Sequence, residues 1–160
     1  WLLAKGFLLN TYEALNSAGS VGVTAVTHGM VCAIDIDEFP VMVQQGAYLA
    51  STDDVRLNAD QSRLNPVVSA CKWIHCSGAG TLWLNAQGLW EMVEVDGSFT
   101  MNSRYVMAYT QSLTLHAPPL AGLKSFLTSG GGVECRFKGR GVVWVQTDAA
   151  KAPVIWQKTG

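Results

Sequence analysis

One nine-residue segment occurs twice in this chain, 61 positions apart, and it restricts the fold more than any other feature of the sequence. The copies read Gly78-Ala-Gly-Thr-Leu-Trp-Leu-Asn-Ala86 and Gly139-Arg-Gly-Val-Val-Trp-Val-Gln-Thr147. Each begins with a Gly-x-Gly turn and continues as an apolar run with the two-residue period of a β-strand. A dinucleotide-binding loop would need a helix after its glycines, so the pattern indicates a tight structural turn instead.

Further matches extend this repeat along most of the chain. At the same spacing, residues 74–76 align with 135–137, and residues 19–25 align more weakly with 80–86. With a gap of two to three residues, 48–50 and 55–57 align with 106–108 and 113–115. We therefore predict an all-β fold: a single β-sandwich domain over 1–160, built from antiparallel units of about 60 residues that pack on one another. The expected units are approximately 1–60, 61–118 and 119–160, and the N-terminal unit is incomplete.

The rest of the chain reads as short strands separated by turns. Asp96-Gly97 predicts a hairpin turn, which would make 81–95 and its neighbours a meander. His28-Gly29 is expected to be a turn, His116 a loop residue, and 122–128 one helical turn. The expected strands are 7–12, 21–26, 30–34, 41–43, 47–50, 55–57, a pair within 67–76, 81–86, 89–95, 105–109, 113–115, 133–146 and an edge segment at 153–156.

The composition excludes several classes of function. Charged residues make up 14% of the 160 residues, the net charge is −1, and no run of Lys or Arg exists to follow a nucleic-acid backbone. No apolar stretch approaches the roughly 20 residues that span a bilayer. The chain starts at Trp1 without an initiator Met, so we expect the natural N-terminus to lie upstream. A surface this poor in charge indicates that a partner covers part of it.

The cysteines are expected to be reduced and buried. Cys32, Cys71, Cys76 and Cys135 contain no Cys-x-x-Cys pair, and free Cys is usually a core residue. This favours a reducing compartment such as cytosol, mitochondrial matrix or stroma. His75 lies beside Cys76, but adjacent strand residues point to opposite faces, so core packing is favoured over a thiol nucleophile.

No cofactor or metal is expected. The acidic group Asp35, Asp37 and Glu38 reads as a solvated strand end, since no fourth ligand is evident.

The tryptophans are the candidate interaction residues. Trp83 and Trp144 occupy equivalent positions in the repeat, on the strand faces opposite Leu82/Leu84 and Val143/Val145. Both faces of these strands are therefore apolar, which fits either a two-layer core or an interface with a partner, where Trp is enriched. Trp90 and Trp156 complete the candidate set.

Two segments resemble the C-terminal signature of the altered inheritance of mitochondria protein 24 family. These are Leu123-Lys-Ser-Phe-Leu-Thr-Ser-Gly-Gly-Gly-Val133 and Arg136-Phe-Lys-Gly-Arg-Gly-Val-Val-Trp-Val-Gln-Thr147. The blocks at 10–14, 46–50 and 80–88 are similar to earlier parts of that family. The resemblance implies a β-sandwich of repeated units like those of the tryptophan RNA-binding attenuation protein (TRAP), without that protein's ligand. It also implies a link to mitochondrial inner-membrane organisation. His28-Gly-Met-Val31 and Asp148 depart from the family pattern, so no family site is transferred.

These observations favour a non-enzymatic interaction module. We expect an accessory or scaffold subunit of a membrane-associated complex inside an organelle, a mitochondrion or alternatively a plastid, with protein partners or further copies of itself. Peripheral membrane association fits this reading, whereas a transmembrane span and nucleic-acid binding do not. A β-sandwich that binds a lipid or small apolar ligand is the alternative. A thiol-dependent enzyme using His75, Cys71 and Cys76 is the third hypothesis.

Overall fold

The computed structural model describes residues 9–25, 28–37, 39–59, 73–116 and 132–148. In this part of the chain the structure is all-β, as the sequence predicts, with one 3₁₀ turn, η2, at Ser103–Tyr105. The strands are β1 (Gly29–Ile36), β2 (Val41–Gln44), β3 (Tyr48–Ser51), β4 (Val55–Ala59), β5 (Trp73–Gly78), β6 (Gly80–Gln87), β7 (Trp90–Asn102), β8 (Val106–Thr110), β9 (Thr114–His116) and β10 (Glu134–Gln146).

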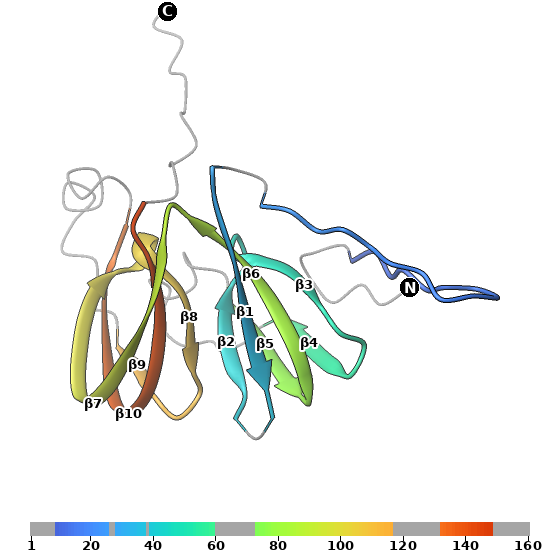
Figure 1. The fold of residues 1–160 in the computed structure, drawn as a ribbon. Coiled ribbons are helices and arrows are strands. Elements are labelled where there is room, and N and C mark those ends of the chain that lie inside the picture. The colour runs from blue at the N-terminus through green and yellow to red at the C-terminus, as the bar shows by residue number, and fades with distance from the viewer. Residues whose placement is uncertain (1–8, 26–27, 38, 60–72, 117–131, 149–160) are drawn as a thin grey trace, which may run out of the picture.

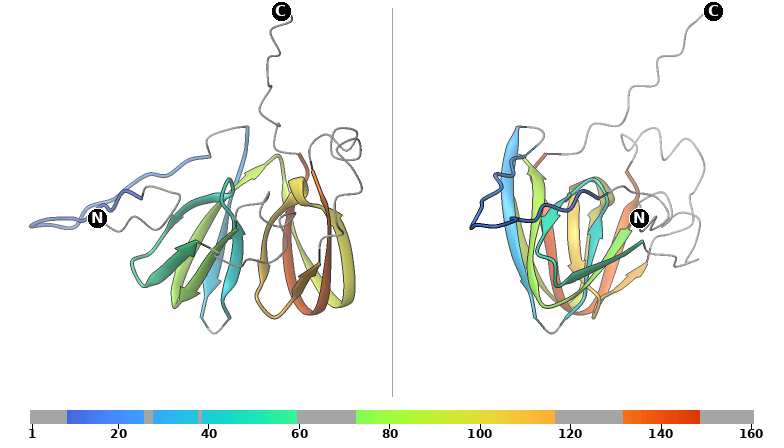
Figure 2. Two further views of the ribbon diagram at one scale, coloured as in Figure 1. Left: turned by 180° about the vertical axis from the view of Figure 1, so that it is seen from behind. Right: turned by 90° about the vertical axis from the view of Figure 1, so that its right-hand side faces the viewer.

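The strands form two antiparallel sheets. One is three-stranded with the order β1-β6-β3. The other is seven-stranded with the order β4-β5-β2-β8-β10-β7, and β9 also pairs with β10. Figure 1 shows the strands from β1 to β6 lying beside the strands from β7 to β10, and the view from behind in Figure 2 shows the same arrangement. We call residues 29–87 the first half and residues 90–146 the second half.

The pairing registers of the two halves correspond position by position. Cys76 pairs with Val41 on one side and Leu57 on the other, and Phe137, its counterpart in the repeat, pairs with Phe99 and Leu115. Through these registers β1 and β2 correspond to the two ends of β7, β3 corresponds to β8, and β4 to β9. Even the irregularity in the register recurs, between β3 and β6 in the first half and between β8 and β10 in the second.

Each half contributes side chains to the core of the other. The first hydrophobic cluster lies between β1-β6-β3 and β2-β5-β4, and Met107, Ala108 and Trp144 of the second half belong to it. The second cluster lies inside the second half, around Phe137, and includes Met42 and Trp73 of the first half. The β2–β8 pairing joins the halves, so neither core is closed without the other half.

The chain bends at glycines where the two halves turn their corners. Gly78 and Gly139 are equivalent, and both have positive φ, +102° and +124°, which only glycine adopts without steric cost. In the first half the corner separates β5 from β6. In the second half β10 runs through it without interruption, so one strand serves both sides of the corner.

The predicted hairpin turn at Asp96-Gly97 and the predicted meander are both wrong. Asp96-Gly97 is not a hairpin turn, because β7 continues through it and Gly97 pairs with Gly139 of β10. The bend at Gly97 therefore folds a two-stranded ribbon of β7 and β10, as Figure 1 shows, rather than pairing β7 with itself. The predicted meander is also wrong, since β6 and β7 belong to different sheets.

The strands predicted at 7–12 and 21–26 are wrong where the structure describes them. Residues 9–12 and 21–25 are not strands, and residues 9–12 and 21–24 are exposed, with Tyr12 at 71% and Val21 at 58%. Figures 1 and 2 show residues 9–25 as an extended arm that leaves the sheets. A strand needs a partner to satisfy its backbone, and among the described residues no strand pairs with this segment.

Smaller boundaries also differ. Gly29 begins β1 instead of forming a turn, His116 ends β9 instead of lying in a loop, and β4 runs on to Ala59. The helical turn at 122–128, the strand at 67–72 and the edge segment at 153–156 lie outside the described residues, as do Cys71 and Trp156.

The first prediction tests the glycine corner with Gly78→Ala against Gly97→Ala. A Cβ at Gly78 would meet the carbonyl oxygen of Asp54, whereas a Cβ at Gly97 meets nothing within 4 Å, and both positions have positive φ. We expect Gly97→Ala to lower the free energy of unfolding by about 1–2 kcal/mol, and Gly78→Ala to lower it by about 2–4 kcal/mol because steric overlap adds to the strain. Urea unfolding followed by tryptophan fluorescence measures both. Equal losses of the free energy of unfolding in the two variants would show that the Asp54 carbonyl moves away from the new Cβ without a measurable cost.

Candidate interaction surface

Trp144 is buried where the two halves meet. It lies on β10, 8% exposed, in the same cluster as Met107 and Ala108. Alternation along β10 sends Val143 and Val145 to the opposite face, into the second cluster. The sequence prediction that both faces of this strand are apolar is correct, and the partner of Trp144 lies within the chain.

Gln146 joins the halves by hydrogen bonds beside Trp144. Its Oε1 accepts from the backbone N–H of Gln87, and its Nε2 donates to the carbonyl of Arg104, both at 2.9 Å. The backbone N–H of Leu89 also donates to Thr147 Oγ1 at 2.9 Å. These hydrogen bonds attach the short link between β6 and β7 to the end of β10. They hold the two halves in one relative position.

Trp83 has the same place in β6, but its surroundings differ. Leu82 and Leu84 point into the first core and are fully buried, which leaves Trp83 on the outer face of the three-stranded sheet, half-buried. Its neighbours in register are Ala33 of β1 and Ala50 of β3. Two tryptophans that the sequence treats as equivalent therefore differ: one lies inside the chain, and the other lies on an outer sheet face.

The remaining tryptophans behave differently again. Trp90 is half-buried and packs against the first core, while Trp156 lies outside the described residues. Sequence reasoning missed Trp73, which is buried and packs edge-on against Tyr109 with ring centroids 5.0 Å apart. Its alternation with Ile74, which points into the first core, was the signal that could have identified it.

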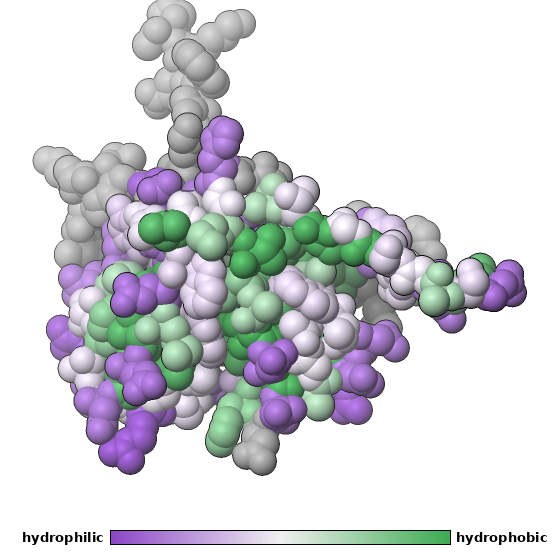
Figure 3. All heavy atoms as spheres, viewed as in Figure 1, coloured by the Kyte–Doolittle hydropathy of each residue, from purple (hydrophilic) through white to green (hydrophobic). Residues whose placement is uncertain are grey.

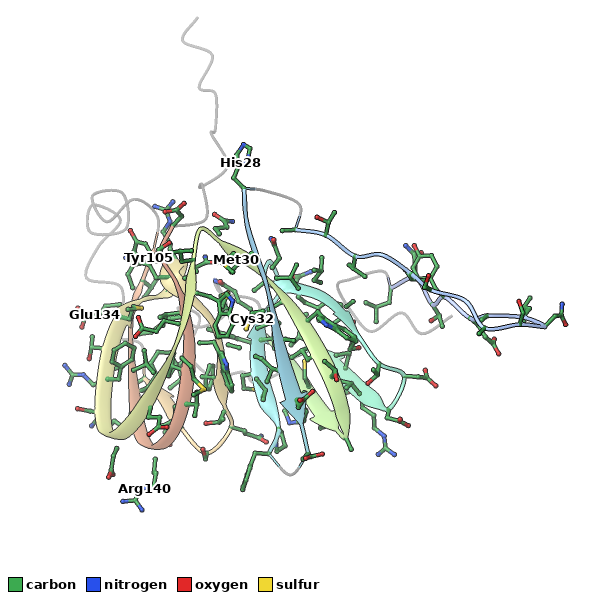
Figure 4. All side chains as sticks on the ribbon, in the orientation of Figure 1. His28, Met30, Cys32, Tyr105, Glu134 and Arg140 are labelled. Carbon is green, nitrogen blue, oxygen red and sulfur yellow. The ribbon has the colours of Figure 1, made fainter. Side chains whose placement is uncertain are left out.

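Exposed apolar side chains gather at the junction of the halves. Met30 and Leu89 directly follow two bridged glycines, Gly29 and Gly88, and are 46% and 63% exposed. Met92, further along β7, is 50% exposed. We call Met30, Leu89 and Met92 the junction patch. Figure 3 shows apolar atoms on this side of the molecule, in the upper part of the view and along the extended segment, and Figure 4 labels Met30 on β1.

The thiols lie in apolar surroundings. Cys32, Cys76 and Cys135 are buried thiols that form no disulfide, as predicted. Burial raises the pKa of Cys76 to about 12 and that of Cys32 to about 11, so both thiols keep their protons at neutral pH. His75 points to the other side of β5 and its Nε2 lies 3.3 Å from Gln111 Oε1. The structure therefore does not bring His75 and Cys76 together.

The polar residues singled out in the sequence are solvent-exposed. Asp35 accepts a hydrogen bond from Thr81 Oγ1 at 2.9 Å at the end of β1, and Asp37 is exposed, while Glu38 is outside the described residues. Within the described ranges, no group of three or more His, Cys, Asp or Glu is placed to hold a metal ion. No helix in this part of the chain has the length and apolar character needed to cross a membrane.

Fold and surface together define an all-β protein with two antiparallel sheets and a partly exposed apolar face. Residues 1–148 match the family model described as mitochondrial biogenesis AIM24, and the chain belongs to this family.

Two streptococcal proteins are similar to this chain. An uncharacterized protein of Streptococcus pyogenes serotype M6 is 22% identical over 134 residues, which are 81% of this chain and 54% of that protein. The crystal structure of another S. pyogenes protein superposes with a TM-score of 0.67 at 22% identity, covering 78% of this chain and 56% of that one. This likeness shows a shared fold. The chain spans about half the length of these relatives.

The second prediction compares Trp144→Ala with Trp83→Ala in the 160-residue chain. Trp144→Ala opens a cavity between the halves and should lower the free energy of unfolding by about 3–5 kcal/mol. Trp83→Ala removes a partly exposed side chain from an outer sheet face, and a loss of about 1 kcal/mol is expected. Chemical denaturation of the two variants decides the matter, and a cost for Trp83 as large as that for Trp144 would contradict the assignment.

The third prediction concerns the thiols. In the native chain at pH 7, Cys32, Cys76 and Cys135 should resist alkylation by iodoacetamide, and all three should react in denaturant. The folded state holds the protons of Cys32 and Cys76 more tightly than the unfolded state does. The contribution of these two thiols to the free energy of unfolding is therefore fully present below the ordinary thiol pKa of 9.0. This contribution falls as the pH rises above 9.0 towards about 11–12. Peptide mass mapping measures the labelling. Rapid native labelling of Cys76 would restore the thiol-enzyme hypothesis.

Proposed function

We propose that this protein is a non-enzymatic interaction module, an accessory or scaffold subunit of a membrane-associated complex inside the mitochondrion, with the plastid as the alternative compartment. The junction patch is the observation that carries the proposal. Met30, Leu89 and Met92 are large apolar side chains, each about half exposed or more, on a chain with 14% charged residues. Such groups on a surface mark sites of association.

The position of the patch suits contact with another protein. It lies where the backbone N–H groups of Gln87 and Leu89 donate hydrogen bonds to Gln146 and Thr147, so its backbone is held in place. Methionine side chains adapt their shape to a partner, and Met30 and Met92 supply this flexibility on a fixed frame. A prearranged apolar surface loses little conformational entropy on binding.

The proposed architecture is a single β-sandwich domain of repeated TRAP-like units with an incomplete N-terminal unit. The matching registers of the two halves support it, since Cys76 and Phe137 have equivalent partners on both sides. Sheet faces that bury apolar residues against one another support the sandwich. The proposed period is the one read from the sequence. In place of the expected units 1–60, 61–118 and 119–160, we propose units that begin at β1 and β7, because the registers of these strands correspond.

Membership of the mitochondrial biogenesis family supports the compartment. Free buried cysteines fit a reducing environment such as the matrix side. The net charge of −1 offers no general attraction to nucleic acid, so protein partners or further copies of the chain are proposed instead.

The fourth prediction tests the junction patch with the double variant Leu89→Asp/Met92→Asp. Both side chains are exposed, so the fold should persist, while burying two carboxylates in an apolar contact should weaken partner binding by roughly tenfold or more. The measurement is affinity purification of the tagged protein from crosslinked mitochondria, followed by quantitative mass spectrometry of the partners that it retains.

Thr114→Asp is the matched control, because Thr114 is an exposed strand residue on β9, outside the patch. The control should retain the same partners as the unsubstituted protein. A partner set that the double variant keeps unchanged would show that the junction patch is not the binding surface.

A further inference from the structure

β1 is an edge strand of the three-stranded sheet. It pairs with β6 along all eight of its residues and, among the described strands, with no other. Figure 1 shows β1 at the front of the molecule, and in the right-hand view of Figure 2 it lies at the margin of the sheets. One side of this strand is therefore open to pairing with a further strand.

The hydrogen bonds of β6 show which backbone groups of β1 point to the open side. The N–H of Asn85 donates to the carbonyl of Ala47 at 2.7 Å, on the side of β6 away from β1. Opposite residues in an antiparallel pair either exchange both bonds or none. Asn85 is in register with Val31, so Val31 makes no backbone hydrogen bond to β6. Because these directions alternate along a strand, Val31, Ala33 and Asp35 point their N–H and C=O groups to the open side.

β1 lacks the features that protect other strand edges in this structure. Its counterpart, the first part of β7, carries Glu91 and Glu94, both exposed, and β4 carries the exposed Arg56. β3 and β9 are only four and three residues long. From Gly29 to Ile34, β1 has no charged residue, no proline and no irregularity in its register with β6. A long, regular and uncharged edge of this kind is a template for pairing with another chain.

The sequence of β1 suits antiparallel pairing with a second β1. With a two-fold axis at Ala33, Val31 lies opposite the partner's Asp35, and Met30 lies opposite the partner's Ile36. The residues that point to the open side then exchange about six hydrogen bonds between the copies. The acidic end of each strand lies beside the uncharged end of the other. A parallel pairing in register would instead place Asp35 beside the partner's Asp35, and like charges in this position are destabilising.

We propose that the open edge of β1 pairs with β1 of a second copy of this chain, antiparallel and centred on Ala33. The two three-stranded sheets then form one continuous sheet with the order β3-β6-β1-β1-β6-β3. Such a two-fold contact is closed, so it gives a dimer and no longer assembly. The proposal rests on the proposed function in taking association as the role of this chain, but it uses the edge of β1 and leaves Leu89 and Met92 outside the contact.

The fifth prediction tests this pairing with Ala33→Pro in the 160-residue chain. Proline at this position removes an N–H that points to the open side, so the bonds between β1 and β6 remain while the dimer loses its central bonds. We expect the dissociation constant of the dimer, measured by sedimentation equilibrium, to rise at least about tenfold. Glu94→Pro is the matched control, because Glu94 holds the position on β7 equivalent to Asp35, and it should leave the dimer unchanged.

The unsubstituted chain decides whether the dimer exists. A chain that sediments as a monomer at about 0.1 mM would overturn the proposal, since a specific contact should associate at this concentration. An equal dissociation constant for Ala33→Pro and the unsubstituted chain would overturn it as well.

Ala33→Lys tests the same contact without a change in the backbone. Ala33 is exposed, so a lysine there should leave the fold of a single copy intact, and circular dichroism should show an unchanged spectrum. In the dimer the two lysines would face each other across the axis, and their repulsion should weaken the dimer at least about tenfold. A dimer that tolerates Ala33→Lys would contradict pairing through this edge.

The register is tested with Ala33→Cys. Opposite residues in a hydrogen-bonded antiparallel pair have Cα atoms about 5.5 Å apart, within the range that a disulfide bridges. With oxidised glutathione as the oxidant, this variant should form a disulfide-linked dimer, and peptide mass mapping should find position 33 linked to itself. Thr114→Cys, on the exposed side of β9, is the control and should stay unlinked. A dimer that does not link through position 33 would contradict the register.

The double variant Leu89→Asp/Met92→Asp separates this proposal from the junction patch. It changes no residue of β1, so it should keep the dimer while it loses the partners retained from mitochondria. A monomeric chain that still retains these partners would overturn the pairing of β1 alone. A dimer whose partner set the double variant leaves unchanged would overturn only the junction patch.

Discussion

The structure depends on an exchange of side chains between its two halves. Met42 and Trp73 leave the first half to fill the core around Phe137, while Met107 and Trp144 leave the second half to close the core around Leu82. The pairing of β2 with β8 joins the two halves at the place where these side chains are exchanged. Because burial of apolar area is the main favourable term in folding, separating the halves would open both cores at once. We infer that residues 29–146 unfold as one cooperative unit.

Much of this fold could be read from the sequence because alternation is a local property. The two-residue period in 81–86 and 142–146 placed β6 and the end of β10 correctly, and the alignment of 48–50 with 106–108 matches the strand registers. The hairpin prediction at Asp96-Gly97 is wrong because a turn dipeptide indicates only that the backbone reverses or bends. Whether the two arms pair with each other or with a third strand depends on β10, which lies much further along the chain. Residues 21–25 have the pattern of a strand, but pattern alone supplies no partner.

The candidate surface was less predictable, since it depends on what lies next to each side chain. Trp83 and Trp144 are identical in pattern, and only the fold shows that a half of the chain covers one and not the other. Trp73 was missed because the positions 61 residues before and after it hold Tyr12 and Glu134, so no tryptophan recurs there to mark the position. The junction patch could not be predicted either, because Met30 and Leu89 become neighbours through a bridge between glycines that are distant in sequence.

The two halves differ in polarity at equivalent positions on their outer faces. Where the first half presents Met42 and Trp73 to its neighbour, the second half presents Thr100 and Glu134 to solvent. Stacked repeat units need a polar outer face at their ends, and these residues give the second half a polar outer face. The outer face of the three-stranded sheet, in contrast, keeps Leu49, Ala50 and Trp83 partly exposed and has an unpaired acceptor on Asn85. An apolar contact is therefore better accommodated on the side of β1, β3 and β6 than on the outer face of the second half.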